Sequence, residues 1–180
     1  MKKALLLGLT LLFVSGAVSA QQLALYADAE RTTWCAENAA VGAMVYVYLF
    51  VNPVAEGITC IELNTTHEGG LYMAFAPTYN PETVQPIMGG FPDSDLGGCF
   101  GGCQPDWIWF ANVMLFNQST EPCRIYIRPF QGPPVQAYPK VLTCGGDEIE
   151  AFPLTDFFIN ACGPISVEES SWGAIKSMYE

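Results

Sequence analysis

Positive charge is scarce in this chain of 180 residues. Seven Lys and Arg side chains stand against 18 Asp and Glu, which gives a formal net charge of −11 at pH 7. A protein that reads nucleic acid needs a basic face to neutralise phosphates, and so few cations do not supply one. The acid excess keeps the chain soluble and disfavours contact with anionic membranes. We therefore expect no nucleic-acid partner.

Histidine occurs only once, as His67. Any Ser-His-Asp or Cys-His catalytic set would have to use this residue. It lies in the polar segment Asn64–Gly70, which we expect to form an exposed turn between two strands. The chain also lacks a Gly-x-Ser-x-Gly elbow, a His-Glu-x-x-His motif and a phosphate loop. These absences predict a protein without enzymatic activity or cofactor, and an extracellular hydrolase that uses two carboxylates is the last alternative.

No apolar run is long enough to span a membrane after the first 20 residues. Residues 1–20 begin with Lys2 and Lys3, continue with an apolar stretch from Ala4 to Val14, and end in small residues up to Ala20. This three-part pattern is typical of a secretory signal peptide. Its removal leaves 5 cations against 18 acids, a net charge of −13. We expect a signal peptide over 1–20, one domain over 21–163 and a tail over 164–180, in a secreted or cell-surface protein.

The remaining chain is rich in short apolar runs with a period of two. Such runs, separated by frequent turn residues, predict an all-β antiparallel sandwich that is immunoglobulin-like or a jelly roll. No long amphipathic helix is expected before the tail. Residues 77–104 look irregular, apart from a poor strand at Thr83–Met88. The expected strands are Leu23–Ala27, Ala43–Val51, Ile58–Leu63, Leu71–Ala76, Trp107–Phe116, Cys123–Phe130, Pro139–Cys144, Glu148–Phe152 and Phe157–Ala161.

The stretch between Glu37 and Glu56 carries no charge. Within it, the run Ala43–Val51 alternates aromatic with β-branched or aliphatic residues, which is a strand signal and not that of a membrane helix. Both faces of this run are apolar, so we expect a central strand that is covered on both sides.

Seven cysteines in an oxidising compartment predict disulfides, with at least one thiol left over. Cys123 and Cys144 bracket what looks like a hairpin around Gly132-Pro133-Pro134, and they are the best single pair. Cys103 has two alternative partners, Cys99 within its own loop and Cys60 on an earlier strand. A zinc site is disfavoured, because the two-residue spacing of its usual ligands is missing.

Two groups of residues are candidate binding sites. Trp107 and Trp109 share one strand face and would form a platform for sugar rings if exposed. The alternative is that they are core, as the apolar Ala111, Val113 and Leu115 continue the same alternation. Asp93 and Asp95 lie in a Gly- and Pro-rich loop and are a weak alternative for a calcium site, although no twelve-residue ligand loop is present.

The expected role of the protein is structural or interactive, with an unknown protein or glycan partner at the cell surface. A carbohydrate-binding module, possibly calcium-dependent, is the alternative.

The last residues carry the most distinctive pattern. Ser170 or Ser171 would cap a short helix with Trp172, Ile175 and Tyr179 on one side. The stretch Val167-Glu168-Glu169-Ser170-Ser171-Trp172-Gly173-Ala174-Ile175-Lys176-Ser177-Met178-Tyr179 resembles the tail of many uncharacterised secreted bacterial proteins. That tail reads Val-Glu-x-Ser/Thr-Ser/Thr-Trp-Gly-x-Ile/Val-Lys-x-Leu/Met-Tyr, usually with a final Arg. This chain ends in Glu180 instead.

The resemblance extends more loosely to the rest of the chain. The shared layout is a signal, a strand like Leu25–Asp28, a cysteine near Cys35, an aromatic strand like Val45–Val51 and a section like Cys123–Cys144 before the tail. It implies an extracellular location and a similar architecture, and no chemistry. The tail motif, with Trp172, Gly173, Lys176 and Tyr179, is either a sorting or attachment signal or a segment that packs on the sandwich.

Overall fold

The computed structural model describes residues 21–53, 56–84 and 91–162, and these residues form β-strands joined by loops. The helix expected near the C-terminus lies outside the described residues. In the described ranges no helix is long and apolar enough to cross a membrane. The strands are β1 (Gln21–Tyr26), β2 (Cys35–Ala36), β3 (Met44–Asn52), β4 (Ile58–Gly69), β5 (Tyr72–Ala74), β6 (Thr78–Tyr79), β7 (Ser94–Gln104), β8 (Ile108–Asn117), β9 (Cys123–Arg128), β10 (Lys140–Thr143), β11 (Glu148–Thr155) and β12 (Phe157–Ile159).

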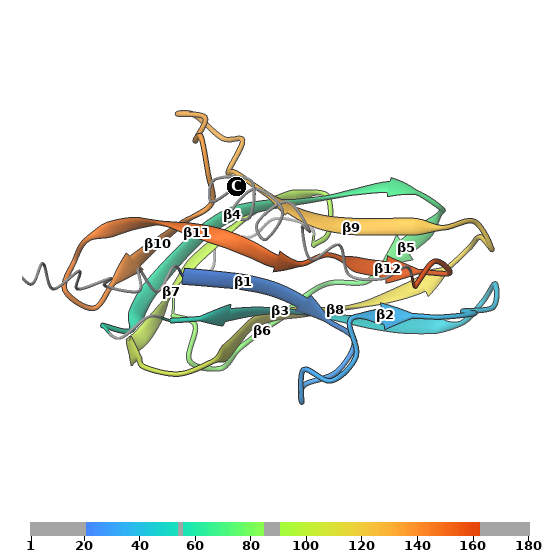
Figure 1. Ribbon diagram of the computed structural model, residues 1–180, viewed down its shortest axis with the longest axis horizontal. Coiled ribbons are helices and arrows are strands. Elements are labelled where there is room, and N and C mark those ends of the chain that lie inside the picture. Colours follow the sequence, from blue (N-terminus) through green and yellow to red (C-terminus); the bar gives the residue numbers. More distant parts are fainter. Residues whose placement is uncertain (1–20, 54–55, 85–90, 163–180) are drawn as a thin grey trace, which may run out of the picture.

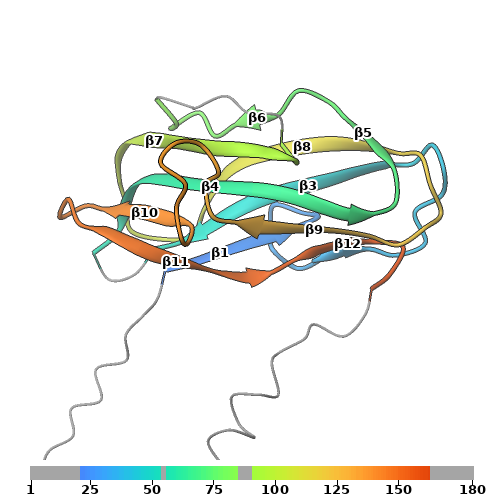
Figure 2. The same ribbon diagram turned by 90° about the horizontal axis from the view of Figure 1, so that it is seen from above.

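The strands pack as two layers. Sheet A contains β1, β3, β8, β5 and β6, and sheet B contains β2, β12, β9, β4, β10 and β7. β11 connects the layers because it pairs with β1 on one side and with β10 on the other. Figure 1 shows β4 and β9 in one layer and β1, β3 and β8 in the other, and Figure 2 shows the strands of both layers running roughly side by side along the long axis.

The expected all-β sandwich is confirmed, with one refinement. Most neighbouring strands are antiparallel, but β1 pairs with β11 in parallel and so does β2 with β12. Both parallel pairs join the start of the chain to its last described strands. A direct hairpin cannot make such a pair, so the ends of the domain are held together by long-range contacts.

The core lies between the two sheets and is built from the inward side chains of alternating strands. Val47, Leu49 and Val51 of β3 are fully buried, as are Ile61 and Leu63 of β4. Cys123, Ile125 and Ile127 of β9 point inward while Arg124 and Arg128 point to solvent, as the alternation predicts. Burial of such apolar side chains stabilises the fold by about 1.5–3 kcal/mol each.

Two stretches that look like loops in the sequence are strands. β4 continues past Leu63 to Gly69, and β7 occupies the Gly-rich segment Ser94–Gln104. β7 pairs with β4 from Thr65↔Ser94 to Ile58↔Gln104, and its Gly97 and Gly98 are buried. Glycine has a low strand propensity, so contacts with β4 override the local preference here.

The disulfides differ from the expected pairing. Cys35 is bonded to Cys162, Cys60 to Cys99 and Cys103 to Cys144, whereas Cys123 is a buried free thiol. The predicted Cys123–Cys144 bond was wrong because β9 and β10 do not form a hairpin. Both strands pair with β4, but Cys123 lies opposite Gly69 and the end of β10 lies opposite Ile58, at the other end of that long strand. Eleven residues of strand separate the two positions by roughly 36 Å.

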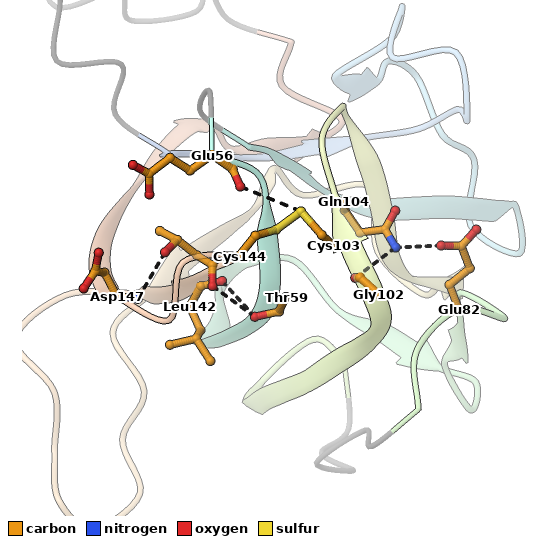
Figure 3. Close-up of a disulfide and its surroundings, with 10 residues drawn as sticks. Glu56, Thr59, Glu82, Gly102, Cys103, Gln104, Leu142, Cys144 and Asp147 are labelled. Carbon is orange, nitrogen blue, oxygen red and sulfur yellow. Dashed lines mark hydrogen bonds between the residues drawn. A yellow bond between two sulfur atoms is a disulfide. The ribbon is translucent and has the colours of Figure 1, made fainter.

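The Cys103–Cys144 disulfide ties the end of β7 to the end of β10 beside the start of β4 (Figure 3). The surrounding groups brace it: Thr59 of β4 donates a hydrogen bond from its hydroxyl to the carbonyl of Leu142, and the Gln104 amide donates to the Glu82 carboxylate. Both alternatives for Cys103 in the sequence, Cys99 and Cys60, were wrong. Those two cysteines are directly opposite each other on β7 and β4 and bond to one another.

Gly57 is the close-packed residue at this corner. It has a left-handed φ of +68°, and a Cβ built on it would lie 2.7 Å from the Cys103 sulfur and 2.8 Å from the Gln104 carbonyl oxygen. We therefore expect Gly57→Ala to lower the free energy of unfolding by about 1–3 kcal/mol. Gly102→Ala is the matched control, because a Cβ at Gly102 meets nothing within 4 Å. Chemical denaturation of both variants tests this, and equal losses would contradict it.

Candidate functional site

A β-bulge in β8 decides which way the two neighbouring tryptophans point. The pairing of β3 with β8 shifts between Leu49 and Phe50, where Leu49 lies opposite Ala111 and Phe50 opposite Trp109. Phe110 is the extra residue, and both it and Ala111 are fully buried. One inserted residue moves every later side chain to the opposite face. Trp109 therefore lies outside the sandwich, while Val113 and Leu115 lie inside it.

Because of this bulge, the interpretation of Trp107 and Trp109 as core residues is excluded. Trp107 and Trp109 share the outer face of sheet A, where each is half-buried against neighbouring rings. Trp109 packs edge to face on Tyr48 with ring centroids 6.4 Å apart, and Trp107 packs on Phe50 at 6.5 Å. The alternation of Ala111, Val113 and Leu115 belongs to the inner face, because the bulge separates the two registers.

The outer face of sheet A is apolar over several strands. We call this surface the aromatic face. Cross-strand partners such as Tyr26↔Tyr48, Tyr46↔Met114 and Met44↔Phe116 place their side chains on the same side of the sheet. Its members are Tyr26 of β1, Met44, Tyr46, Tyr48 and Phe50 of β3, Met73 of β5, Trp109, Asn112, Met114 and Phe116 of β8, and Trp107 just before β8.

The aromatic face is open to solvent at one end. Met44, Tyr46 and Met73 are 50%, 47% and 47% exposed, whereas Phe50 at the other end is only 2% exposed. The prediction that strand Ala43–Val51 is covered on both sides was wrong for its first part, where Met44 and Tyr46 are about half exposed, and holds only at Phe50. None of these residues is charged, and the Arg31 guanidinium lies over the rings of Trp107 and Phe50 at the buried end of the face. In a chain with 18 acids, such a neutral, partly exposed surface of aromatic and methionine side chains is characteristic of a binding surface.

The outer face of sheet B has the opposite character. Arg124 and Arg128 flank the ring of Tyr126, and each guanidinium carbon lies 4.8 Å from its centroid. Arg124 forms an ion pair with Asp156 at 2.6 Å, and the Tyr126 hydroxyl donates a hydrogen bond to Glu68. The hydrogen bond and ion pair with Asp156 raise the pKa of the Arg124 guanidinium. This face is polar: Arg124 is paired with Asp156, and the Arg128 guanidinium donates a hydrogen bond to the Tyr126 hydroxyl.

His67 is not in an exposed turn. It lies on β4, half-buried, and its Nδ1 is 2.7 Å from the carboxylate of Asp93. Asp93 also accepts hydrogen bonds from the backbone N–H of His67 at 2.9 Å and from the hydroxyl of Tyr72 at 2.6 Å. Tyr72 belongs to sheet A and His67 to sheet B, so this carboxylate ties the two layers together. In the described part of the chain no Ser, Thr or Cys side chain is hydrogen-bonded to the His67 ring, and a nucleophile–base pair is therefore not formed there.

The free thiol of Cys123 lies below this cluster and is 3% exposed. A Cβ on Gly70 would come within 2.6 Å of the Cys123 Cβ, so the backbone of the β4–β5 turn packs tightly against the Cys123 side chain. Burial, with the nearby negative charge of Asp93, raises the pKa of the Cys123 thiol to about 11. Burial and the hydrogen bond to Asp93 also raise the pKa of Tyr72. A buried thiol of high pKa is unreactive at neutral pH, because the thiolate is the nucleophile.

Asp93 and Asp95 point to different partners. Asp95 accepts hydrogen bonds from the side-chain amide of Asn64 at 2.9 Å and from the backbone N–H of Gln131 at 2.7 Å. Asp93 belongs to the His67 cluster. Over residues 21–53, 56–84 and 91–162, no group of three or more His, Cys, Asp or Glu side chains is arranged to hold a metal ion. The weak calcium alternative at these two residues stays a prediction.

The tail residues Trp172, Gly173, Lys176 and Tyr179 lie outside the described residues.

Sequence reasoning found the two tryptophans but missed most of the aromatic face around them. The signal was present in Met44, Tyr46 and Tyr48, which alternate with the buried valines of β3. It was read as a second buried face, since a run that is apolar at every position does not show which face is covered.

Comparisons with known proteins relate the chain by its fold alone. No protein-family model and no curated protein matches it. Among solved structures, the sixth cohesin of scaffoldin B from Acetivibrio cellulolyticus, crystallised with a Cel5 dockerin, superposes with a TM-score of 0.56 at 14% identity, over 79% of this chain and 99% of that one. A type I cohesin–dockerin complex from Clostridium thermocellum gives 0.54 at 12% identity, over 78% and 92%. A non-cellulosomal cohesin from the archaeon Archaeoglobus fulgidus gives 0.51 at 10% identity, over 87% and 98%. The described chain thus has the jelly-roll sandwich fold of the cohesins.

Proposed function

We propose that this protein is a non-catalytic interaction module that acts outside the cell or at its surface and docks a partner protein against the aromatic face. The observation that carries the proposal is the neutral, partly exposed stretch of Met44, Tyr46 and Met73, joined to the aromatic rings of β3 and β8. Exposed apolar patches with Tyr, Trp and Met mark protein interfaces. Two of the cohesins that share the fold were crystallised with a dockerin partner, which supports an interaction role.

The charge around the aromatic face suggests the chemistry of the partner. The loop between β1 and β2 carries Asp28 and Glu30, and Asp106 precedes Trp107. A partner with apolar side chains at its centre and Lys or Arg at its rim complements this surface, and the net negative charge of the chain would speed its approach.

Three disulfides support the extracellular assignment, because such bonds persist in oxidising compartments. The signal-like segment 1–20 and the resemblance of the tail to those of secreted bacterial proteins point the same way. We propose that residues 164–180 direct attachment or sorting, and this part of the proposal rests on the sequence pattern alone.

The proposal is tested with one variant on each sheet. The full chain would be used to isolate its partner from the native extracellular fraction, and the affinity of the purified partner would then be measured. We expect Tyr46→Ser to weaken binding by about tenfold or more, as loss of an aromatic interface anchor does. Tyr126→Ser is the control, because it removes a tyrosine from the outer face of sheet B. If Tyr126→Ser lowers the affinity of the partner and Tyr46→Ser leaves it unchanged, the interface lies on sheet B and the proposal is wrong.

The second candidate is a carbohydrate-binding module, favoured by the outward position of Trp107 and Trp109 after the bulge. The rings of both tryptophans pack edge to face on neighbouring rings, which is a poor match for the flat platform that stacks on sugars. A glycan that binds there would change the tryptophan fluorescence on titration and lose this effect in Trp109→Ala.

A further inference from the structure

Arg31 is held in an unusual place by a tight loop between β1 and β2. The Asp28 carboxylate accepts hydrogen bonds from the backbone N–H of Thr32 at 2.9 Å and from its hydroxyl at 3.1 Å. The backbone N–H of Ala27 donates to the carbonyl of Thr33 at 2.6 Å, which closes the loop. Arg31, at the tip, has a left-handed φ of 62°. This conformation is uncommon outside glycine, and the closed loop maintains it.

The loop places the Arg31 guanidinium on the aromatic face. Its central carbon lies 5.1 Å from the centroid of the Trp107 ring and 5.4 Å from that of Phe50. Tyr26 and Tyr48 pack on Phe50 in turn, with centroids 5.9 Å and 6.2 Å away. Two aromatic rings thus contact the cation directly, and further rings support one of them; contact of a cation with aromatic rings is the means by which proteins bind organic cations.

Arg31 has no acidic partner among the residues that the structure describes. Within the described ranges, Arg124 and Lys140 each form an ion pair with a carboxylate, and no carboxylate lies within 4.0 Å of the Arg31 guanidinium. The aromatic rings therefore hold this cation by themselves. A cation–π contact at a solvent-exposed site contributes only about 0.5–1 kcal/mol. An occupant held so weakly is displaced readily by another cation of the same kind.

We propose that Phe50 and Trp107, with Tyr26, Tyr48 and Trp109 around them, form a binding site for an arginine side chain of the partner protein, and that Arg31 is the chain's own occupant of this site. The inference rests on the proposed function in taking the aromatic face as the docking side. The planar guanidinium stacks on ring faces in a way that a lysine ammonium does not. A partner arginine that enters the site displaces Arg31 into solvent.

The test uses a small probe on the full chain, so it needs no knowledge of the partner. N-acetylarginine amide would be titrated at constant ionic strength while tryptophan fluorescence is followed, with N-acetylcitrulline amide as its neutral analogue. We expect Arg31→Ala to bind the arginine probe about two- to fivefold more tightly than the unchanged protein, the factor that 0.5–1 kcal/mol represents. Arg128→Ala, which removes an equal charge from the outer face of sheet B, should bind as the unchanged protein does. Adding Trp107→Leu to Arg31→Ala should abolish the gain.

Three results would overturn the inference: equal affinity with and without Arg31, equal binding of citrulline and arginine probes, or a gain that survives Trp107→Leu. If Arg31→Ala does not fold, Arg31→Gln replaces it, since glutamine keeps the polar character of the loop tip and removes the charge. The two proposals fail separately. If the probe does not bind but Tyr46→Ser still weakens partner binding, only the arginine site is refuted. If the probe binds but Tyr46→Ser leaves partner binding unchanged, only the docking surface is refuted.

Discussion

Removal of the Cys35–Cys162 disulfide by Cys35→Ala/Cys162→Ala is expected to lower the free energy of unfolding by about 5 kcal/mol, the largest loss from any of the three bonds. The bond joins residues 127 apart in the sequence, whereas Cys60–Cys99 and Cys103–Cys144 span 39 and 41. The chain entropy that a cross-link removes from the unfolded state grows with loop length, and the same relation predicts about 4 kcal/mol for each of the shorter loops. The folded structure adds a local reason, since β2 is only two residues long and, among the residues that the structure describes, pairs with β12 alone.

The measurement is urea denaturation of the three double variants, each built on Cys123→Ala so that no free thiol can exchange with the remaining bonds. The expected order of stability places the Cys35/Cys162 variant lowest. Cys60→Ala/Cys99→Ala serves as the reference, because β4 and β7 remain paired along their whole length without the bond. A Cys35/Cys162 variant more stable than this reference would show that the ends of the domain are held by strand pairing instead of by the disulfide.

The sequence predicts the type of structure well and its connections poorly. Short runs of β-branched, aromatic and aliphatic residues located β1, β3, β8 and β9 to within one or two residues, because such residues favour strands. β7 was not predicted, since four glycines in eleven residues are typical of a loop. The segment forms a strand because it pairs with β4, which is distant in the sequence. The disulfides failed for a related reason. A hairpin was inferred from neighbours in sequence, but β9 and β10 pair with opposite ends of β4 and not with each other.

The candidate site shows the same limit more sharply. The two tryptophans were identified from their spacing, but the side of the sheet they occupy depends on a single bulge at Phe110. A bulge is defined by the strand opposite, and nothing in residues 107–116 alone marks the extra residue. His67 was read as a turn residue because its neighbours are polar, although the polar residues face solvent and Asp93 from a continuous strand. Arg31 carried no signal at all, since its rings come from β3 and from the residue before β8.

Between pH 9 and pH 11 the protein is expected to lose about 2–3 kcal/mol of stability through Cys123 alone. The folded thiol has a pKa of about 11 against an ordinary value of 9.0, because it is buried near Asp93. Below pH 9 both states keep the proton and the contribution is fully present. Between the two pKa values the unfolded chain releases the proton and the folded chain does not, so stability falls by about 1.4 kcal/mol for each pH unit. The loss is complete once the folded thiol also ionises.

Comparison with Cys123→Ala isolates this effect, because the substitution removes the titrating group and any change in packing adds a constant that does not vary with pH. The difference in unfolding free energy between the two proteins should be level up to pH 9 and then shrink by about 2–3 kcal/mol towards pH 11. Tyr72 should cause a second decrease in the free energy of unfolding, above pH 10, since burial and the hydrogen bond to Asp93 raise the pKa of Tyr72 as well. This second decrease should be absent in Tyr72→Phe. Parallel curves for the unchanged protein and Cys123→Ala across this range would mean that the thiol is hydrated in the folded state. In that case the close packing of the Gly69-Gly70 backbone would not exclude water from Cys123, and the thiol would react with alkylating reagents in the folded protein as it does in the unfolded chain.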